Sequence, residues 1–421
     1  MTDNNKLINA INEGILPDRG DRGAYKGTIQ NLKALFDWYG ITCQYDCISK
    51  AQSIIFNNSD NNEHDLKDSG NYSTLYSLLA LNNMPQSSIN LIPALMINNT
   101  INPILEYLIN AKHKPKQNFF RELADSLIVD DSDKHYRDLA LKTWLFQCVA
   151  AADSAIHAKV RGAVKFELVL VLQGKQGIGK TTFFKSLVPE HLKNYVATGE
   201  HLDPDDVTSL RRCLSVWLCE IGELDATFRR SDIERLKAFL SQGEDKIRLP
   251  YDKAISNYKR RTSFCGSVNP EHFLVDKTGN RRFLPVAVKH IERLPNNAAF
   301  LSGLWAEIWH EYTTSNKAIW WASHELETLL KERLEQHEET SPIEEMILTR
   351  FSLAPDSKPL KPVIVKDHYT ATQVLIASGI NNPNKSQVRE VKPLLERFGV
   401  ACVQNNGIRG YWLADNEKRR V

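Results

Sequence analysis

A glycine-rich segment ending in lysine and threonine is where this 421-residue sequence first shows residue types and spacing that could do chemistry. Gly174 and Gly179 are the fixed glycines of a G-x-x-x-x-G-K-T pattern, which Lys180 and Thr181 complete. The backbone N–H groups of such a loop converge on phosphate at a helix N-terminus, the lysine bridges the β- and γ-phosphates, and the threonine hydroxyl joins a magnesium shell. The pattern therefore predicts ATP and Mg2+ as cofactors, with these binding residues: Gly174, Gln176, Gly177, Gly179, Lys180, Thr181 and Thr182.

Two glutamates and one asparagine follow apolar stretches further along the chain. Glu220 comes directly after residues 214–219, and Glu223 follows three positions later. A carboxylate at a strand tip beside a phosphate loop polarises a magnesium-bound water, and a second carboxylate can orient the attacking water. We assign Glu220 to the metal and Glu223 to the water, and the order of the two stays open. Asn269, after the apolar stretch 262–268, is expected to sense the γ-phosphate.

Arg281 and Arg282 follow a Gly-Asn turn, and packing explains two consecutive arginines poorly. A guanidinium fork directed at the γ-phosphate of a neighbouring subunit, an arginine finger, is the functional interpretation. A surface pair of arginines is the alternative, and the pattern does not say which arginine would be the finger. The expected catalytic set is thus Lys180, Glu220, Glu223, Asn269, Arg281 and Arg282.

Residues 246–261 contain six basic residues against one acidic residue, with Tyr251 and Tyr258 between the charges. This composition is typical of a surface that touches phosphates and stacks on bases, although a solvated hairpin explains it equally well. The DNA-contacting residues expected here are Lys246, Arg248, Tyr251 and Lys253.

The elements that must hold these residues indicate an α/β fold. The run 168–172 is apolar and β-branched, as in a strand buried on both faces, and a helix opens at Lys180. Further buried strands are predicted at 214–219, 262–268 and 283–288. Strand, glycine loop and helix together predict a P-loop NTPase core.

Four regions are predicted along the chain. Residues 1–115 form a mainly helical N-terminal region of unknown role, and residues 116–340 form the ATPase core with a helical lead-in. A short acidic run at 130–133 is expected to be a solvated turn rather than a metal site. Residues 341–366 are a proline-containing linker. Residues 367–421, with two helices and a hairpin, predict a winged helix-turn-helix.

The C-terminal region is also expected to contact duplex DNA. Residues 385–421 hold eight basic residues against four acidic ones. Arg389 would lie in the recognition helix and Arg409 in the hairpin, and docking to another protein is the alternative role.

Composition constrains the setting of the protein. The net charge of +2 neither demands nor excludes nucleic acid. No apolar run reaches the roughly 18 residues that a membrane helix needs, and the polar N-terminus lacks a secretory signal. The seven cysteines are scattered without zinc spacing, so the cytoplasm is the expected location, with no membrane partner.

These motifs in this order resemble the virulence-associated protein E family and, more broadly, the superfamily 3 helicases of phages, plasmids and phage satellites. The resemblance covers roughly residues 140–321 and rests on Gly174–Thr181, Cys219–Asp225, Arg248–Lys253 and Ser267–Phe283. It implies an AAA+-like core, a homo-oligomeric ring that is commonly hexameric, and ATP bound between subunits. It also implies that the segment around Lys253 is a pore hairpin gripping single-stranded DNA.

Two functions are compatible with this pattern. The first is an ATP-dependent DNA helicase or replication initiator of a phage or mobile genetic element, which hydrolyses ATP to translocate on DNA. The second is an ATP-switched oligomeric DNA-binding regulator or defence protein that does not unwind. Strand displacement coupled to hydrolysis separates the two.

Overall fold

The computed structural model describes residues 11, 14–20, 23–57, 67–112, 117–159, 164–222, 224, 230–247, 256–269, 280–294, 297–315, 318–336, 342–353 and 367–417. The chain divides into two compact units, Met1–His337 and Glu338–Val421. Among the helices of the described residues, none is long and apolar enough to cross a bilayer.

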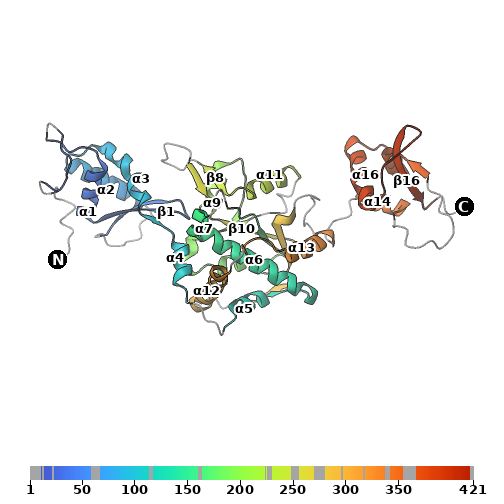
Figure 1. Ribbon diagram of the computed structural model, residues 1–421, viewed down its shortest axis with the longest axis horizontal. Helices are drawn as coiled ribbons and strands as arrows, with labels where there is room; N and C mark the ends of the chain where they lie inside the picture. Colours follow the sequence, from blue (N-terminus) through green and yellow to red (C-terminus); the bar gives the residue numbers. More distant parts are fainter. Residues whose placement is uncertain are drawn as a thin grey trace. The chain divides into compact units, whose positions relative to one another are not determined.

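The first unit is built around a parallel sheet. Its described strands are β5 (Val169–Gln173), β6 (Val196–Glu200), β7 (Leu218–Ile221), β10 (Ser263–Val268) and β11 (Phe283–Ala287). Their spatial order is β11-β5-β10-β7-β6, and every neighbouring pair runs parallel. The middle strand, β10, is labelled in Figure 1. The predicted mixed α/β fold is confirmed, and the strands predicted at 168–172, 262–268 and 283–288 lie within one residue of their observed bounds.

The strand predicted at 214–219 was placed wrongly. Helix α9 (Val207–Leu214) and a turn occupy most of that stretch, and β7 begins only at Leu218. The Asp206 side chain caps α9 by accepting hydrogen bonds from two backbone N–H groups of its first turn. Because β7 starts and ends later than predicted, Glu220 lies within the strand rather than after it.

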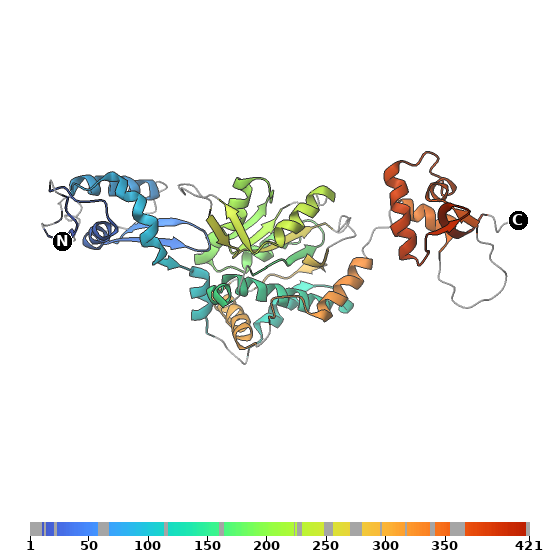
Figure 2. The same ribbon diagram turned by 45° about the horizontal axis from the view of Figure 1, so that its top comes forward.

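Separate layers of helices cover the two faces of the sheet (Figure 2). Successive residues of β5 point to opposite faces, so Leu170 and Leu172 join one core while Val169 and Val171 join the other. The first core also takes side chains from α6 (Lys134–Ala152), α8 (Lys180–Ser186) and α12 (Ala298–Thr314). The second is closed by α9 and α11 (Arg230–Leu240). This double burial explains why β5 is apolar up to its last residue, Gln173.

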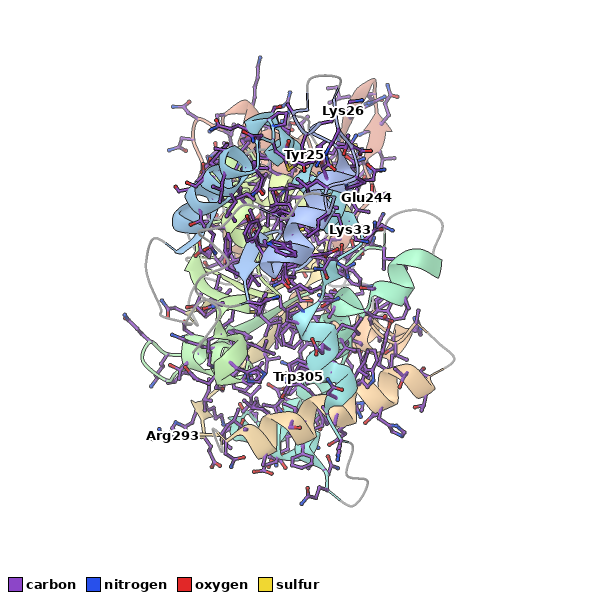
Figure 3. The ribbon with its side chains drawn as sticks, turned by 90° about the vertical axis from the view of Figure 1, so that its left-hand side faces the viewer. Tyr25, Lys26, Lys33, Glu244, Arg293 and Trp305 are labelled. Carbon is purple, nitrogen blue, oxygen red and sulfur yellow. The ribbon has the colours of Figure 1, made fainter. Side chains whose placement is uncertain are left out.

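Buried side chains fix the strand and helix that flank the glycine loop. The Gln147 amide of α6 exchanges hydrogen bonds of 2.8 and 2.9 Å with the backbone of Leu168, just before β5. The Trp305 indole of α12 donates to the carbonyl of Leu187, one residue after α8, over 2.8 Å. Trp305 lies inside the helical layer (Figure 3). Both ends of the strand–loop–helix segment are therefore anchored to the same layer.

The N-terminal part of the first unit consists mainly of helices, and it also contains a small sheet that was not predicted. A hairpin of β1 (Ile41–Asp46) and β2 (Gln52–Phe56) is extended by β3 (Thr100–Ile101). The surrounding helices are α1 (Ile29–Tyr39), α2 (Lys67–Leu81), η2 (Gln86–Leu91) and α3 (Ile92–Ile97). The short strands alternate buried and half-buried residues, a signal that the helical spacing of the preceding segment obscured.

The lead-in to the core consists of α4 (Pro103–Asn110), α5 (Phe119–Ser126), β4 (Leu127–Ile128), η3 (Asp131–Asp133) and, after α6, α7 (Ser154–Lys159). Its acidic run forms a 3₁₀ turn, as predicted, in which each carboxylate has a basic partner. Asp130 pairs with Lys289, Asp131 with Lys134 over 2.7 Å, and Asp133 with Arg333. Elsewhere lie η4 (Glu190–Tyr195), β12 (His290–Ile291) and α13 (His324–Gln336).

The second unit has its own core of aliphatic and aromatic side chains. Its helices are α14 (Pro342–Arg350), α15 (Ala371–Ala377) and α16 (Lys385–Arg397). Its strands are β13 (Phe351–Ser352), β14 (Asp367–Tyr369), β15 (Val403–Asn405) and β16 (Ile408–Asp415), with β16 pairing to the other three. Part of the stretch expected to be a linker, 341–366, thus forms α14 and β13, because Ile347 and Phe351 are buried in this core.

Candidate nucleotide-binding site

The predicted phosphate loop follows β5, next to the point where the chain reverses the direction in which it adds strands to the sheet. From β5 the chain crosses to the far edge at β6, returns through β7 and β10, and then passes to the other side of β5 at β11. The carboxyl ends of β5 and β10 therefore border the crevice in which open parallel sheets bind ligands. The backbone N–H of Gly174 donates to the carbonyl of Val268 over 3.2 Å, which ties the loop to the end of β10. Asn269 follows at this same edge and is exposed.

The loop needs its glycines for two different reasons. Gly177 and Gly179 have φ angles of 85° and 92°, a left-handed conformation that side chains disfavour. A Cβ on Gly174 would lie 2.5 Å from the carbonyl oxygen of Val288, so this position has no room for one. Gln176 and Thr182 are exposed beside them. The glycine pattern thus reflects backbone geometry, as the phosphate-loop prediction requires.

Lys180 is buried at the first position of α8, and its ammonium group faces the loop. Its Nζ donates to the carbonyl oxygens of Gly174 at 2.6 Å and Lys175 at 2.9 Å. A positive charge held inside a ring of backbone dipoles favours an anion in the same loop.

Glu220 is the buried acid of the site, with 1% of its surface exposed. Its Oε1 accepts hydrogen bonds from the hydroxyls of Thr181 at 2.8 Å and Ser267 at 3.1 Å. Its Oε2 is buried and has no hydrogen-bond partner within the described part of the chain. Burial raises the pKa of Glu220, and the two hydroxyls, the backbone N–H of Gly199 and the charge of Lys180 oppose that rise. A buried carboxylate oxygen without a partner, beside a hydroxyl, is a donor set that suits Mg2+.

Two residues near Glu220 were missed in the sequence. Ser267 is the second hydroxyl of β10, near the end of the strand, and its position there was the available signal. Gly199 (φ 70°) lies so close to the residue after β7 that a Cβ on Gly222 would lie 2.8 Å from its backbone. No local pattern shows that contact, because β6 and β7 meet only in the folded sheet.

The two arginines lie at the opposite end of the strands from the glycine loop. They end η5 (Asn280–Arg282), just before β11, and Phe283 is in register with Val169 at the start of β5. The length of β5 separates them from the glycine loop, about 17 Å at ~3.3 Å per residue. Arg282 is half-buried, and its Nε contacts Glu167 at 3.0 Å and Ser241 at 2.9 Å. Arg281 is exposed beside a cavity of about 160 Å³.

The predicted DNA-contacting segment is a hairpin where the structure describes it. β8 (Glu244–Ile247) pairs antiparallel with β9 (Ser256–Lys259), and Lys246 is exposed opposite Asn257. Arg248, Tyr251 and Lys253 lie outside the described residues, as does Glu223.

One basic residue of that segment was wrongly counted as surface charge. Arg260 is fully buried, and its guanidinium bonds Asp245 and the carbonyl of Phe239, the latter at 2.7 Å. It also lies 4.1 Å from the centre of the Phe239 ring. Its charge is neutralised within the fold, so it does not face solvent. In the second unit, by contrast, Arg389 on α16 and Arg409 on β16 are both exposed.

Residues 108–339 match the virulence-associated protein E-like domain. The chain belongs to this family. The match spans more than half of the chain and includes the glycine loop, Glu220 and both arginines of η5. The family resemblance expected from the ordered motifs is therefore confirmed.

Other comparisons of this virulence-associated protein E-like chain add two findings. No curated protein matches it. Among solved structures, it is similar to the A-form apo structure of the NrS-1 C-terminal region. The two are 12% identical, the similarity covers 90% of this chain and 97% of that chain, and the TM-score is 0.43. A second structure of that region, also 12% identical, covers 89% and 96% of the two chains with a TM-score of 0.45.

Proposed function

We propose that this chain is a Mg2+-dependent ATPase that translocates on DNA, a helicase or replication initiator of a phage or mobile genetic element. One observation carries the proposal: the buried, unsatisfied Oε2 of Glu220 lies beside the Thr181 hydroxyl, next to a loop built to hold phosphate. A structural carboxylate would be expected to use both oxygens. We infer that this oxygen is available to a ligand.

The proposed role of each residue in the site follows from its charge or hydrogen-bonding groups. Lys180 and the backbone of Gly174–Gly179 would bind the phosphates, and Thr181 with Glu220 would hold Mg2+. The metal, when bound, neutralises charge on the phosphates. Asn269 would hydrogen-bond the γ-phosphate or the attacking water, and Glu223 stays the proposed water-orienting carboxylate.

Arg281 is the arginine that we propose as the finger. Arg282 is held by Glu167 and Ser241 of its own chain, whereas Arg281 is exposed. Because both lie at the far end of the strands from the glycine loop, they suit the nucleotide of a neighbouring subunit rather than their own. This arrangement supports a ring, which we propose to be a hexamer.

The DNA contacts are assigned to both units. Lys246 and the rest of the β8–β9 hairpin would grip single-stranded DNA, and the second unit would bind duplex DNA as a winged helix through Arg389 and Arg409. Salt-dependent duplex binding measured on an Arg389→Ala/Arg409→Ala variant tests the second contact. Two fewer phosphate contacts should lower the log–log salt slope by about 2, and an unchanged slope would remove both arginines from the interface.

The deciding experiment is the ATPase rate with and without single-stranded DNA. Wild type should hydrolyse ATP and respond to DNA, whereas Lys180→Ala should lose turnover by about 100-fold or more, because phosphate stabilisation is lost. Lys185→Ala, an exposed lysine on the same helix, is the matched control and should keep wild-type turnover. Turnover that survives Lys180→Ala would refute the catalytic assignment.

Strand displacement then separates the two functions that the motifs allow. A motor unwinds a tailed duplex only with hydrolysable ATP. ATP-dependent DNA binding without displacement would instead establish the ATP-switched DNA-binding protein.

A further inference from the structure

The turn of the β1–β2 hairpin is fixed to the core of the first unit. The Tyr195 hydroxyl, just before β6, donates to Asp46 Oδ2 over 2.7 Å. The Lys50 ammonium is buried and donates to the carbonyl of Leu214, the last residue of α9, where the helix dipole favours a cation. The hairpin, drawn in blue, reaches toward the core in Figure 2. These contacts hold the N-terminal sheet beside the strands of the core.

A cavity of about 450 Å³ opens beside this junction. One wall comes from β1, β2 and α3 of the N-terminal part, including Tyr45 and Cys47, and the other from β9 and Arg261. Its volume is within the roughly 300–1,000 Å³ typical of ligand pockets. None of the glycine-loop residues lines it, so this is not the nucleotide site.

The chemistry of the cavity is aromatic and basic. Tyr45 and Tyr258 come from opposite walls, and they are close enough that Tyr258, after burial, contributes to raising the pKa of Tyr45. Lys259 and Arg261 supply positive charge, and no acidic residue is among the described residues lining the cavity. The Arg261 guanidinium donates to the carbonyl of Ala152 at 3.3 Å, which helps to orient it. Aromatic rings beside cations form the usual platform for unstacked bases.

The cavity is continuous with the hairpin that we assign to DNA. β9 forms its wall, and Asn257 on that strand pairs with Lys246 of β8. Two carboxylates of β8 lie across from this wall: the half-buried Glu244 faces Lys259, and the buried Asp245 faces Tyr258 and pairs with Arg260. Because Asn257 both pairs with Lys246 and lines the cavity, a strand bound at Lys246 would lie beside the cavity.

We propose that this cavity is a second contact for single-stranded nucleic acid, in which one base stacks on Tyr258 and Tyr45 while Arg261 and Lys259 contact the backbone phosphates. This inference rests on the proposed DNA contact of the hairpin and extends it to the N-terminal part, which gains a function. The N-terminal sheet would be half of a nucleic-acid site.

The test uses the full chain and a fluorescent oligo-dT in an anisotropy titration. Tyr258→Ala and Tyr45→Ala should each weaken binding by about fivefold or more, the lower end of what loss of one base stack costs. Tyr258→Phe and Tyr45→Phe keep the ring and should stay within about twofold of wild type. Tyr76→Ala, an exposed tyrosine on α2 outside the cavity, is the matched control and should bind as wild type.

A crosslinking measurement on the wild-type protein tests the same contact, and its result does not depend on whether any variant folds. Oligonucleotides carrying 5-iodouracil, irradiated with the protein and mapped by mass spectrometry, should form adducts on Tyr45 or Tyr258. Adducts confined to other residues would overturn the proposal.

The outcomes also separate this inference from the proposed function. If Lys246→Ala weakens oligo-dT binding while both tyrosine-to-alanine variants bind normally, the cavity is not a DNA contact, and the hairpin assignment stands. If wild type does not bind oligo-dT at all, the DNA-translocation proposal and this inference both fail.

Discussion

Glu220 has an environment that penalises its own charge. It is buried within a strand, one of its oxygens receives two hydroxyl hydrogen bonds, and the other has no partner in the described chain. Burial raises its pKa, so at neutral pH the ionised form costs stability that a bound cation would return. Without a bound cation, the folded protein is thus less stable than it would be with a neutral side chain at position 220.

Glu220→Gln should therefore stabilise the protein while it inactivates the site. Turnover should fall by about 100-fold or more, because the carboxylate is lost, and the nucleotide-free Tm should rise by about 2–4 °C at neutral pH. As pH falls through the raised pKa, the wild-type carboxyl takes up a proton, so the difference in Tm should shrink. ATPase assays and thermal melts over a pH series measure both effects.

A lower Tm for Glu220→Gln at neutral pH would show that the carboxylate serves structure rather than a ligand. Glu325→Gln is a suitable control, since this glutamate is exposed and pairs only with the exposed His135 among its described contacts. It should leave both readouts unchanged.

The residues of the site differed in how well the sequence could predict them. Lys180 and Thr181 follow from spacing alone, because a phosphate loop is one continuous segment. Glu220 was found from its position after an apolar run, although only the last two residues of that run belong to β7. Ser267 and Gly199 were missed, because they approach Glu220 only when three strands align. Whether these residues bind nucleotide stays a prediction.

The β8–β9 hairpin is the element whose attachment matters most for the proposed DNA contact. At its base, Asp245 pairs with Arg260, with side-chain exposures of 3% and 0%. Arg260 also donates to the carbonyl of Phe239 near the end of α11. The buried ion pair therefore closes the base of the hairpin, and the hydrogen bond from Arg260 to Phe239 joins it to the helix that covers the sheet.

Asp245→Asn should destabilise the protein by about 3–5 kcal/mol, because it leaves the Arg260 charge buried without its partner. The midpoint of urea unfolding measures this loss. Lys246→Ala, the exposed neighbour, should change the free energy of unfolding by less than about 0.5 kcal/mol. Equal midpoints for the two variants would contradict the assignment of Asp245 as the anchor.

The elements of the core were more predictable than those of the N-terminal part. β5, β10 and β11 are buried on both faces, so their apolar runs stand out along the chain. β1 and β2 are short, and their partners include β3, more than 40 positions further along the chain. The hairpin around 246–259 was expected from composition, but the burial of Arg260 depends on Phe239 and Asp245 and could not be read from a charge count.

At the scale of the whole molecule, one chain does not bring all of the proposed catalytic residues together. Arg281 and the glycine loop lie at opposite ends of the same strands. If each site is completed by the next subunit, two differently damaged chains should restore one another in a mixed ring.

Mixing Arg281→Ala with Lys180→Ala should therefore recover a measurable fraction of wild-type ATPase activity, although each variant alone is inactive. In the mixture, some interfaces pair an intact loop from one variant with an intact arginine from the other. Mixing Arg282→Ala protein with Lys180→Ala protein tests which of the two arginines acts as the finger, since Arg282 is already bound by Glu167 of its own chain. Arg281→Ala protein that retains full activity on its own would remove the finger from the mechanism.

The separation of Arg281 from the glycine loop also has a kinetic consequence. A site assembled from two chains makes the reaction order in protein greater than one, so specific activity falls on dilution while each chain stays folded. Nucleotide affinity, which depends on the loop of one chain, would be unaffected by the same dilution. On the proposed mechanism, a single chain would bind ATP without hydrolysing it. Hydrolysis would begin only when enough copies of the chain had gathered on DNA to form the shared site.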